Sequence, residues 1–241
     1  ASGDFESGIR TGLQSILASP DFVFRYVTAR PGTVAPDGNY RISDLALATR
    51  LSFFLWGTPP DAELMSLANA QKLTGPVLEA QVKRMLKDPR SSALGTRFAA
   101  QWLRLQDLDK IHPDAFWFPD YDQQLADAMR TETVTFFNNL VREDRSMLEL
   151  FSANYTFVND RLARHYGIPN IVGDEFRRVT YPDATRRGLF GQGAILTLTS
   201  HANRTSPVLR GKWVMEVLLG TPPPPPPMDG SGPPFEETKG G

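Results

Sequence analysis

The densest group of polar side chains in this sequence lies between residues 199 and 213. Within it, the residues best suited to bind a ligand are His201, Asn203, Arg204, Ser206 and Arg210. Arginine pairs with carboxylates and phosphates through two parallel hydrogen bonds, and histidine can bind or release a proton near neutral pH. A helix beginning after Ser206 adds backbone N–H groups that face an anion. The segment is therefore a candidate site for an anion such as a carboxylate or a haem propionate.

A structural interpretation of the same segment is favoured over this binding hypothesis. Ser206 and Pro207 are typical of a helix start, with serine as the N-cap and proline at the first helical position. Arg204 and Arg210 would then pair with carboxylates at the edge of the core and fix the connection. Helix starts in many proteins share these features, so the site remains a hypothesis.

Other catalytic chemistry has little support in the sequence. The three histidines, His112, His165 and His201, lack the spacing of metal ligands, so no metal site is predicted. His165 is expected to interact with the C-terminal end of a helix. A Gly-x-Ser-x-Gly nucleophile elbow and a phosphate-binding glycine loop are both absent from the sequence. No reaction is assigned, and a non-catalytic role is favoured.

A group of aromatic side chains precedes the longest predicted helix. Its members are Trp102, Phe116, Trp117, Phe118 and Tyr121. Such a group can line a sugar-binding surface, but aromatic residues beside a helix junction more often fill the core.

Composition excludes several classes of protein. The 241 residues carry 26 basic and 27 acidic side chains, a net charge of -1, which disfavours a nucleic-acid partner. The sequence has no cysteine, which excludes disulfides, thiolate metal sites and covalent haem attachment within the chain. No apolar run approaches the ~20 residues needed to span a bilayer, so no transmembrane segment is predicted.

Periodic apolar residues predict a chain made mainly of helices. The expected helices cover about 5–17, 43–56, 61–68, 76–87, 91–105, 121–143, 159–166, 188–198 and 207–219. Residues 155–158 are β-like, and 175–180 are expected to form at most a lone strand. The fold class is therefore all-α, a multi-helix orthogonal or bundle-like assembly with a polyproline C-terminal tail. The expected domains are 1–30, 37–167 and 168–220, followed by a proline-rich linker over 221–241.

Several strings of residues, taken together and in order, resemble a known group of proteins. These strings are Leu17–Phe22, Arg50–Trp56, Tyr155–Asn159, Arg164–Pro169 and Thr205–Trp213. They resemble uncharacterised helical modules of planctomycete- and myxobacterial-type multidomain proteins associated with cytochrome c. The resemblance covers nearly the whole chain as three successive modules, about 1–30, 40–167 and 186–241.

The resemblance implies a segment of a larger exported protein, periplasmic or secreted. In such proteins a Cys-x-x-Cys-His motif follows the proline run, so c-type haem is expected in other parts of the parent protein and no cofactor in this chain. The expected partners are other domains of the same polypeptide or another protein chain. The resemblance carries no catalytic residues.

Three functional hypotheses follow. The first is a non-catalytic module that positions haem domains for electron transfer, with the proline tail as a spacer. The second is an extracytoplasmic enzyme or binding module for a polymer or another ligand, with its site around His201 to Arg210. The third is a structural subunit of a larger membrane-associated complex.

Overall fold

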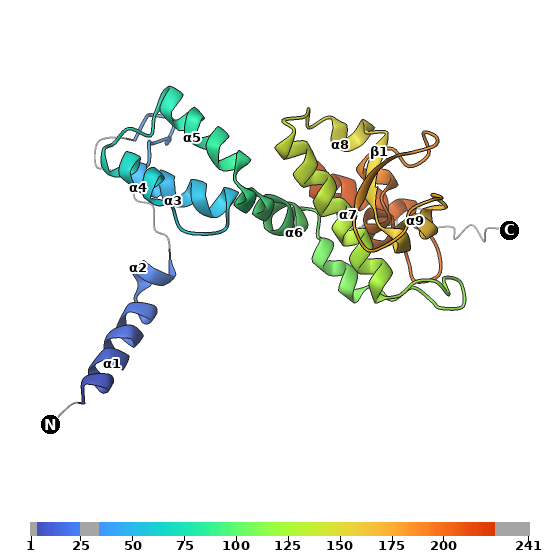
Figure 1. The fold of residues 1–241 in the computed structure, drawn as a ribbon, viewed down its shortest axis with the longest axis horizontal. Coiled ribbons are helices and arrows are strands. Elements are labelled where there is room, and N and C mark those ends of the chain that lie inside the picture. Colours follow the sequence, from blue (N-terminus) through green and yellow to red (C-terminus); the bar gives the residue numbers. More distant parts are fainter. Residues whose placement is uncertain (1–3, 25–33, 225–241) are drawn as a thin grey trace. The chain divides into compact units, whose positions relative to one another are not determined.

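The computed structural model of the chain describes residues 4–24 and 34–224. It divides into two compact units, Ala1–Asp88 and Pro89–Gly241, called here the first and the second unit (Figure 1). The division falls inside the range 37–167 expected as one domain. Helices dominate the described residues, which contain eleven α-helices and one two-stranded sheet, so the predicted all-α class is confirmed. Most of the predicted proline tail lies outside the described residues.

The first unit begins with a helix whose apolar side chains are all exposed. α1 (Phe5–Ala18) forms as predicted and is followed by the short α2 (Pro20–Val23). The apolar stripe of α1 includes Phe5, Ile9 and Leu13, and none of its residues is buried. The helix predicted from the apolar periodicity therefore forms, and no described residue covers its apolar face.

Three further helices make the core of the first unit. α3 (Asp44–Leu55), α4 (Ala62–Asn69) and α5 (Gly75–Lys87) match the predicted ranges. Ser43 caps α3 by accepting a hydrogen bond from the Ala46 amide, and Asp61 caps α4 in the same way. The buried Trp56 donates from Nε1 to the Met85 carbonyl oxygen at 2.9 Å, which ties α3 to α5.

The second unit is built around its longest helix, α7 (Gln123–Arg142). Asp122 accepts a 2.7 Å hydrogen bond from the Leu125 amide and starts α7. The inward face of α7 contributes Leu125 and Met129 to a core shared with elements before and after it in the chain. The other buried members of this core are Leu103, Leu105, Leu108, Ala128, Val158, Leu162, Ala163, Leu189, Ala194, Ile195 and Trp213.

The continuous helix predicted over 91–105 is wrong. A 3₁₀ turn, a π-helical segment, α6 and a second 3₁₀ segment follow one another, at Pro89–Ser92, Leu94–Ala99, Ala100–Trp102 and Leu105–Lys110. One cause is visible at Gly95, whose amide donates to Asn138 Oδ1 of α7 at 3.1 Å instead of to a helical carbonyl. The helical periodicity of the sequence does not reveal this hydrogen bond, because Asn138 lies 43 residues after Gly95 in the chain.

A small sheet follows α7. After α8 (Glu149–Ser152), strand β1 (Tyr155–Val158) pairs antiparallel with β2 (Arg177–Thr180), so the expectation of a lone strand is corrected. α9 (Asp160–Tyr166) lies between the strands in the sequence, is capped by Asn159 and ends at Gly167, whose φ of 68° gives the left-handed C-terminus that glycine favours. The exposed β2 lacks the apolar alternation that would predict a paired strand.

Two short helices end the described chain. α10 (Gly193–Leu198) follows a 3₁₀ turn at Leu189–Gly191, and α11 (Pro207–Trp213) continues as a π-helical segment, Val214–Leu218. Both predicted helices therefore exist, in shorter regular form. Among the described residues, no helix combines the length and the apolar character that crossing a membrane requires.

Candidate functional site

The second unit contains a cavity of about 420 Å³. This volume lies in the range of roughly 300–1,000 Å³ that is usual for small-molecule sites. The apolar and aromatic part of the lining consists of Ile111, Pro113, Trp117, Phe118, Pro119, Tyr121, Leu125, Met129, Gly193 and Leu196. The polar part consists of Asp120, His165, Arg186, Thr197, Ser200, His201, Arg204 and Thr205.

Two loops form the walls on one side of the cavity. The first, residues 111–121, brings in the aromatic side chains, and the second, residues 199–206, brings in His201 and Arg204. The Asp114 amide donates a 2.8 Å hydrogen bond to the Ala202 carbonyl oxygen, which joins the two loops. Asp114 also accepts from the Phe116 amide through Oδ1 and so fixes the turn before Trp117.

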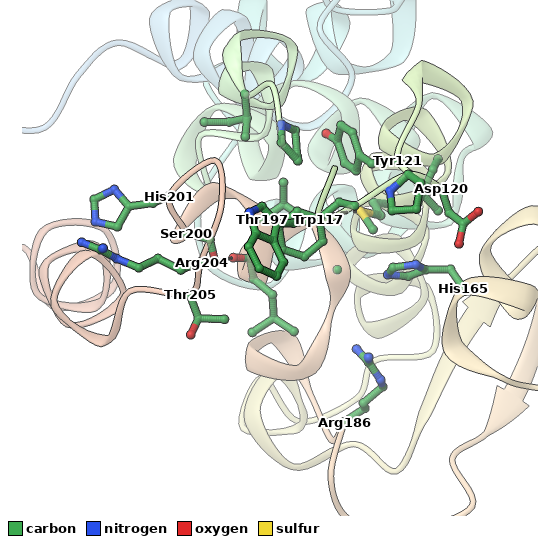
Figure 2. A pocket seen from close by; sticks show the side chains of 18 residues that line it. Trp117, Asp120, Tyr121, His165, Arg186, Thr197, Ser200, His201, Arg204 and Thr205 are labelled. Atoms are coloured by element: carbon green, nitrogen blue, oxygen red, sulfur yellow. Dashed lines mark hydrogen bonds between the residues drawn. The ribbon is translucent and has the colours of Figure 1, made fainter. Parts of the chain in front are cut away.

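The second loop is a tight turn. Ser200 and Thr205 form an antiparallel bridge, and the His201 amide donates to the Arg204 carbonyl oxygen at 2.9 Å. Figure 2 shows the side chains of His201 and Arg204 next to each other at one end of the cavity, with the ring and the guanidinium extending away from Trp117. His201 and Arg204 are close together because they are the first and last residues of one four-residue turn.

The remaining residues of the predicted site lie elsewhere. Asn203 is exposed on the turn and does not line the cavity. Ser206 is buried and accepts from the Leu209 amide at 3.2 Å, the N-cap expected from the sequence. Arg210 lies on α11 and donates from Nε to Thr199 Oγ1 at 3.4 Å. The structure therefore brings His201 and Arg204 to the cavity and gives Ser206 and Arg210 structural contacts.

The other end of the cavity contains Asp120, His165 and Arg186, which Figure 2 shows on the far side of Trp117. Arg186 donates from Nη1 to the Gly191 carbonyl oxygen at 3.2 Å, and its guanidinium lies 4.5 Å from the centre of the Tyr166 ring. No sequence pattern links these residues, because a loop, the end of α9 and the loop before α10 each supply one of them.

Desolvation and nearby charges favour the neutral form of His165. Desolvation is the main cause that lowers the pKa of His165. The positive charges of Arg186 and Arg161 lower this pKa further, and Asp120 opposes them. A neutral imidazole can donate one hydrogen bond and accept another.

A buried carboxyl group lies behind this end of the cavity. Glu132 of α7 is 0% exposed and accepts from Thr156 Oγ1 at 2.6 Å and from Tyr166 Oη at 2.5 Å. Burial raises the pKa of Glu132 to about 7, and the hydrogen bonds and the charge of Arg186 partly offset that rise. Tyr166 Oη in turn accepts from the Gly193 amide at 2.7 Å, so this network holds the start of α10.

Two hydroxyl groups of the lining are held by hydrogen bonds within the chain. The Ser200 hydroxyl donates to the Leu196 carbonyl oxygen, and the Thr197 hydroxyl donates to Met129 Sδ. Neither of these two contacts is to a histidine, the base that would activate a hydroxyl group as a nucleophile. In the part of the chain that the structure describes, no three His, Asp or Glu side chains converge as metal ligands would. The cavity combines an apolar middle with hydrogen-bonding groups at both ends, the usual form of a small-molecule site.

Comparison with protein families assigns the chain. Residues 42–168, more than half of the chain, match the model of PSD4, a family described as a protein of unknown function (DUF1592). The chain belongs to the DUF1592 family. Residues 186–240 match a second model, PSCyt3, described as a protein of unknown function (DUF1588). The names tie both to planctomycete cytochrome c-associated proteins, which confirms the resemblance seen in the sequence. Neither a curated protein nor a solved structure matches the chain.

The cavity lies where the two family segments meet. The DUF1592 segment supplies the lining from Ile111 to His165, and the DUF1588 segment supplies the lining from Arg186 to Thr205. The polar end with Asp120, His165 and Arg186 draws on both segments, whereas the polar side chains at the His201 end come from the DUF1588 segment. The hydrogen bond from Asp114 to Ala202 likewise joins one segment to the other.

Proposed function

We propose that the second unit binds a small, mainly apolar molecule carrying a negatively charged group. The observation that carries this proposal is the cavity between the two family segments, with His201 and Arg204 at one end. Among the described residues, Asp120 is the one carboxylate in the lining, and it lies at the other end. The His201 end therefore favours an anion.

The middle of the cavity favours a flat apolar group. Trp117 and Phe118 line the cavity together with the aliphatic side chains of Leu125, Met129 and Leu196. Ring stacking and burial of apolar surface are the main sources of affinity in such a lining. Trp117 is 61% exposed, so a bound ring would cover surface that now contacts water.

An aromatic carboxylate tests this proposal. We expect 2-naphthoate to bind the chain in an isothermal titration, and Trp117→Ala to weaken the binding about fivefold, because one ring contact contributes ~1 kcal/mol. Leu148→Ala is the matched control, since Leu148 is 74% exposed in the same unit and does not line the cavity. Absence of binding at millimolar 2-naphthoate would refute the proposal.

A second role is favoured by the names of the two families. We propose that the chain is a non-catalytic module of an exported cytochrome c-associated protein and positions haem domains for electron transfer. The family names support the association with cytochrome c, and the six consecutive prolines from Pro222 to Pro227 suit a stiff spacer. Because the chain has no cysteine, covalent c-type haem would be held by other parts of the parent protein.

An absorption spectrum of the intact parent protein, with a pyridine haemochrome assay, tests this second role. A c-type haem signal is expected. A colourless parent protein would contradict haem positioning and would leave the binding proposal untouched.

A further inference from the structure

The end of the cavity opposite to His201 is a second polar surface that no sequence pattern indicates. Asp120 comes from the loop before α7, His165 from the last turn of α9, and Arg186 from the loop before α10. His165 is close enough to the other two for their charges to act on it. One carboxylate, one imidazole and one guanidinium therefore face the same end of one cavity (Figure 2).

The charges at this end nearly cancel. Asp120 opposes the positive charges of Arg186 and Arg161 at His165, and Arg161 is also paired with Asp122 at 3.2 Å. The buried carboxyl group of Glu132 lies close enough to Arg186 for that positive charge to act on it. His165 contributes no charge near neutral pH. Thr156, Tyr166 and Tyr181 also surround Glu132, and these side chains are uncharged near neutral pH. A second anion would gain little here, and it would be repelled by Asp120.

A group that both donates and accepts hydrogen bonds fits this end. Asp120 can only accept, Arg186 can only donate, and neutral His165 can do either. A hydroxyl group donates one hydrogen bond and accepts others, so it can satisfy both Asp120 and Arg186. An unsubstituted apolar group would leave these side chains unpaired when it displaced their water.

We propose that Asp120, His165 and Arg186 form a subsite for an uncharged hydroxyl group, so that the ligand of the cavity is an elongated hydroxy acid. This inference rests on the proposed function, because it places the acid group at His201 and Arg204. The aromatic middle of the cavity then separates the two polar groups of the ligand. The specificity arises from both family segments, since each contributes side chains to the subsite.

Three probes with the same ring test the subsite. Titration calorimetry compares 2-naphthoate, 6-hydroxy-2-naphthoate and naphthalene-2,6-dicarboxylate on the full chain. We expect the hydroxy acid to bind about fivefold tighter than 2-naphthoate, the effect of one neutral hydrogen bond. The dicarboxylate should bind no tighter than 2-naphthoate. If the dicarboxylate binds tightest, or the hydroxyl gives no advantage, the subsite proposal is overturned while the proposed function stands.

Two variants test whether Asp120 causes the tighter binding of the hydroxy acid. Asp120→Ala should remove the advantage of the hydroxy acid over 2-naphthoate, measured as the ratio of the two affinities on the same variant. Asp174→Ala, an exposed carboxylate of the same unit outside the cavity, should preserve the full advantage. An advantage that survives in Asp120→Ala would contradict the assignment. Failure of all three probes to bind would instead refute the proposed function itself.

Discussion

The hydroxyl group of Tyr166 donates a 2.5 Å hydrogen bond to the carboxyl group of Glu132, which is completely buried. The same hydroxyl oxygen accepts from the Gly193 amide, at the first residue of α10. One side chain at the end of α9 thus connects the longest helix of the second unit to the helix that lines the cavity. The connection also crosses from the DUF1592 segment to the DUF1588 segment. Consequences for stability and for binding follow from this contact.

The stability of the chain should depend on pH through Glu132. Burial raises the pKa of this carboxyl group from 4.5 to about 7, so the folded state holds the proton more tightly than the unfolded state. Its contribution to stability is complete below pH 4.5 and is lost as the pH rises through 7. Because glutamine does not titrate, the stability of Glu132→Gln relative to the wild type should increase by on the order of 3 kcal/mol over this interval.

Denaturant unfolding of both proteins between pH 5 and pH 8 measures this difference. The two proteins share every other titrating group, so their difference isolates Glu132. Parallel stability curves over that range would show that the carboxyl group titrates as it does in the unfolded chain.

Removal of the Tyr166 hydroxyl should destabilise the second unit. Tyr166→Phe leaves the Gly193 amide and one oxygen of Glu132 without their buried partner, at a cost of about 2–3 kcal/mol. Tyr121→Phe is the matched control, because the Tyr121 hydroxyl is buried without a hydrogen-bond partner among the described residues. We expect the control to unfold at the same denaturant concentration as the wild type or at a higher one. Equal losses in the two variants would contradict the network.

The irregular segment before α7 should depend on the absence of a side chain at Gly95. A Cβ atom at this position would lie 2.6 Å from the amide atoms of Asn138, which are held by hydrogen bonds to Gly95 and Ser92. We expect Gly95→Ala to destabilise the chain by about 1–3 kcal/mol. Gly211→Ala in α11 meets no atom within 4 Å and should be neutral or stabilising. Thermal unfolding of the two variants distinguishes a specific contact from a general effect of alanine.

Much of the fold was predictable because it depends on local signals. The helix starts at Ser43, Asp61, Asp122, Asn159 and Ser206 all follow a polar side chain that caps the next turn. Gly167 ends α9 for an equally local reason, its positive φ. The π-helical segment at 94–99 and the pairing of β2 were not predictable, since both depend on residues distant in sequence.

Part of the candidate site was also predictable from the sequence, and part was not. His201 and Arg204 belong to one turn, so their shared location follows from short-range structure. Asp120, His165 and Arg186 meet only after α7, α9 and α10 have packed together, and no spacing in the sequence anticipates that. Trp117 and Phe118 belong to an aromatic group expected to fill the core, and instead they line the cavity.

The most direct test of the central claim compares the anion with its uncharged analogue. Calorimetric titrations of 2-naphthoate and 2-naphthamide should be made on the wild type, on Arg204→Gln and on the control Arg187→Gln, whose exposed side chain does not line the cavity. We predict that the wild type and Arg187→Gln bind the carboxylate severalfold tighter than the amide, and that Arg204→Gln loses this preference. Equal affinity of the wild type for both compounds, or a preference that persists in Arg204→Gln, would contradict an anion site at His201 and Arg204.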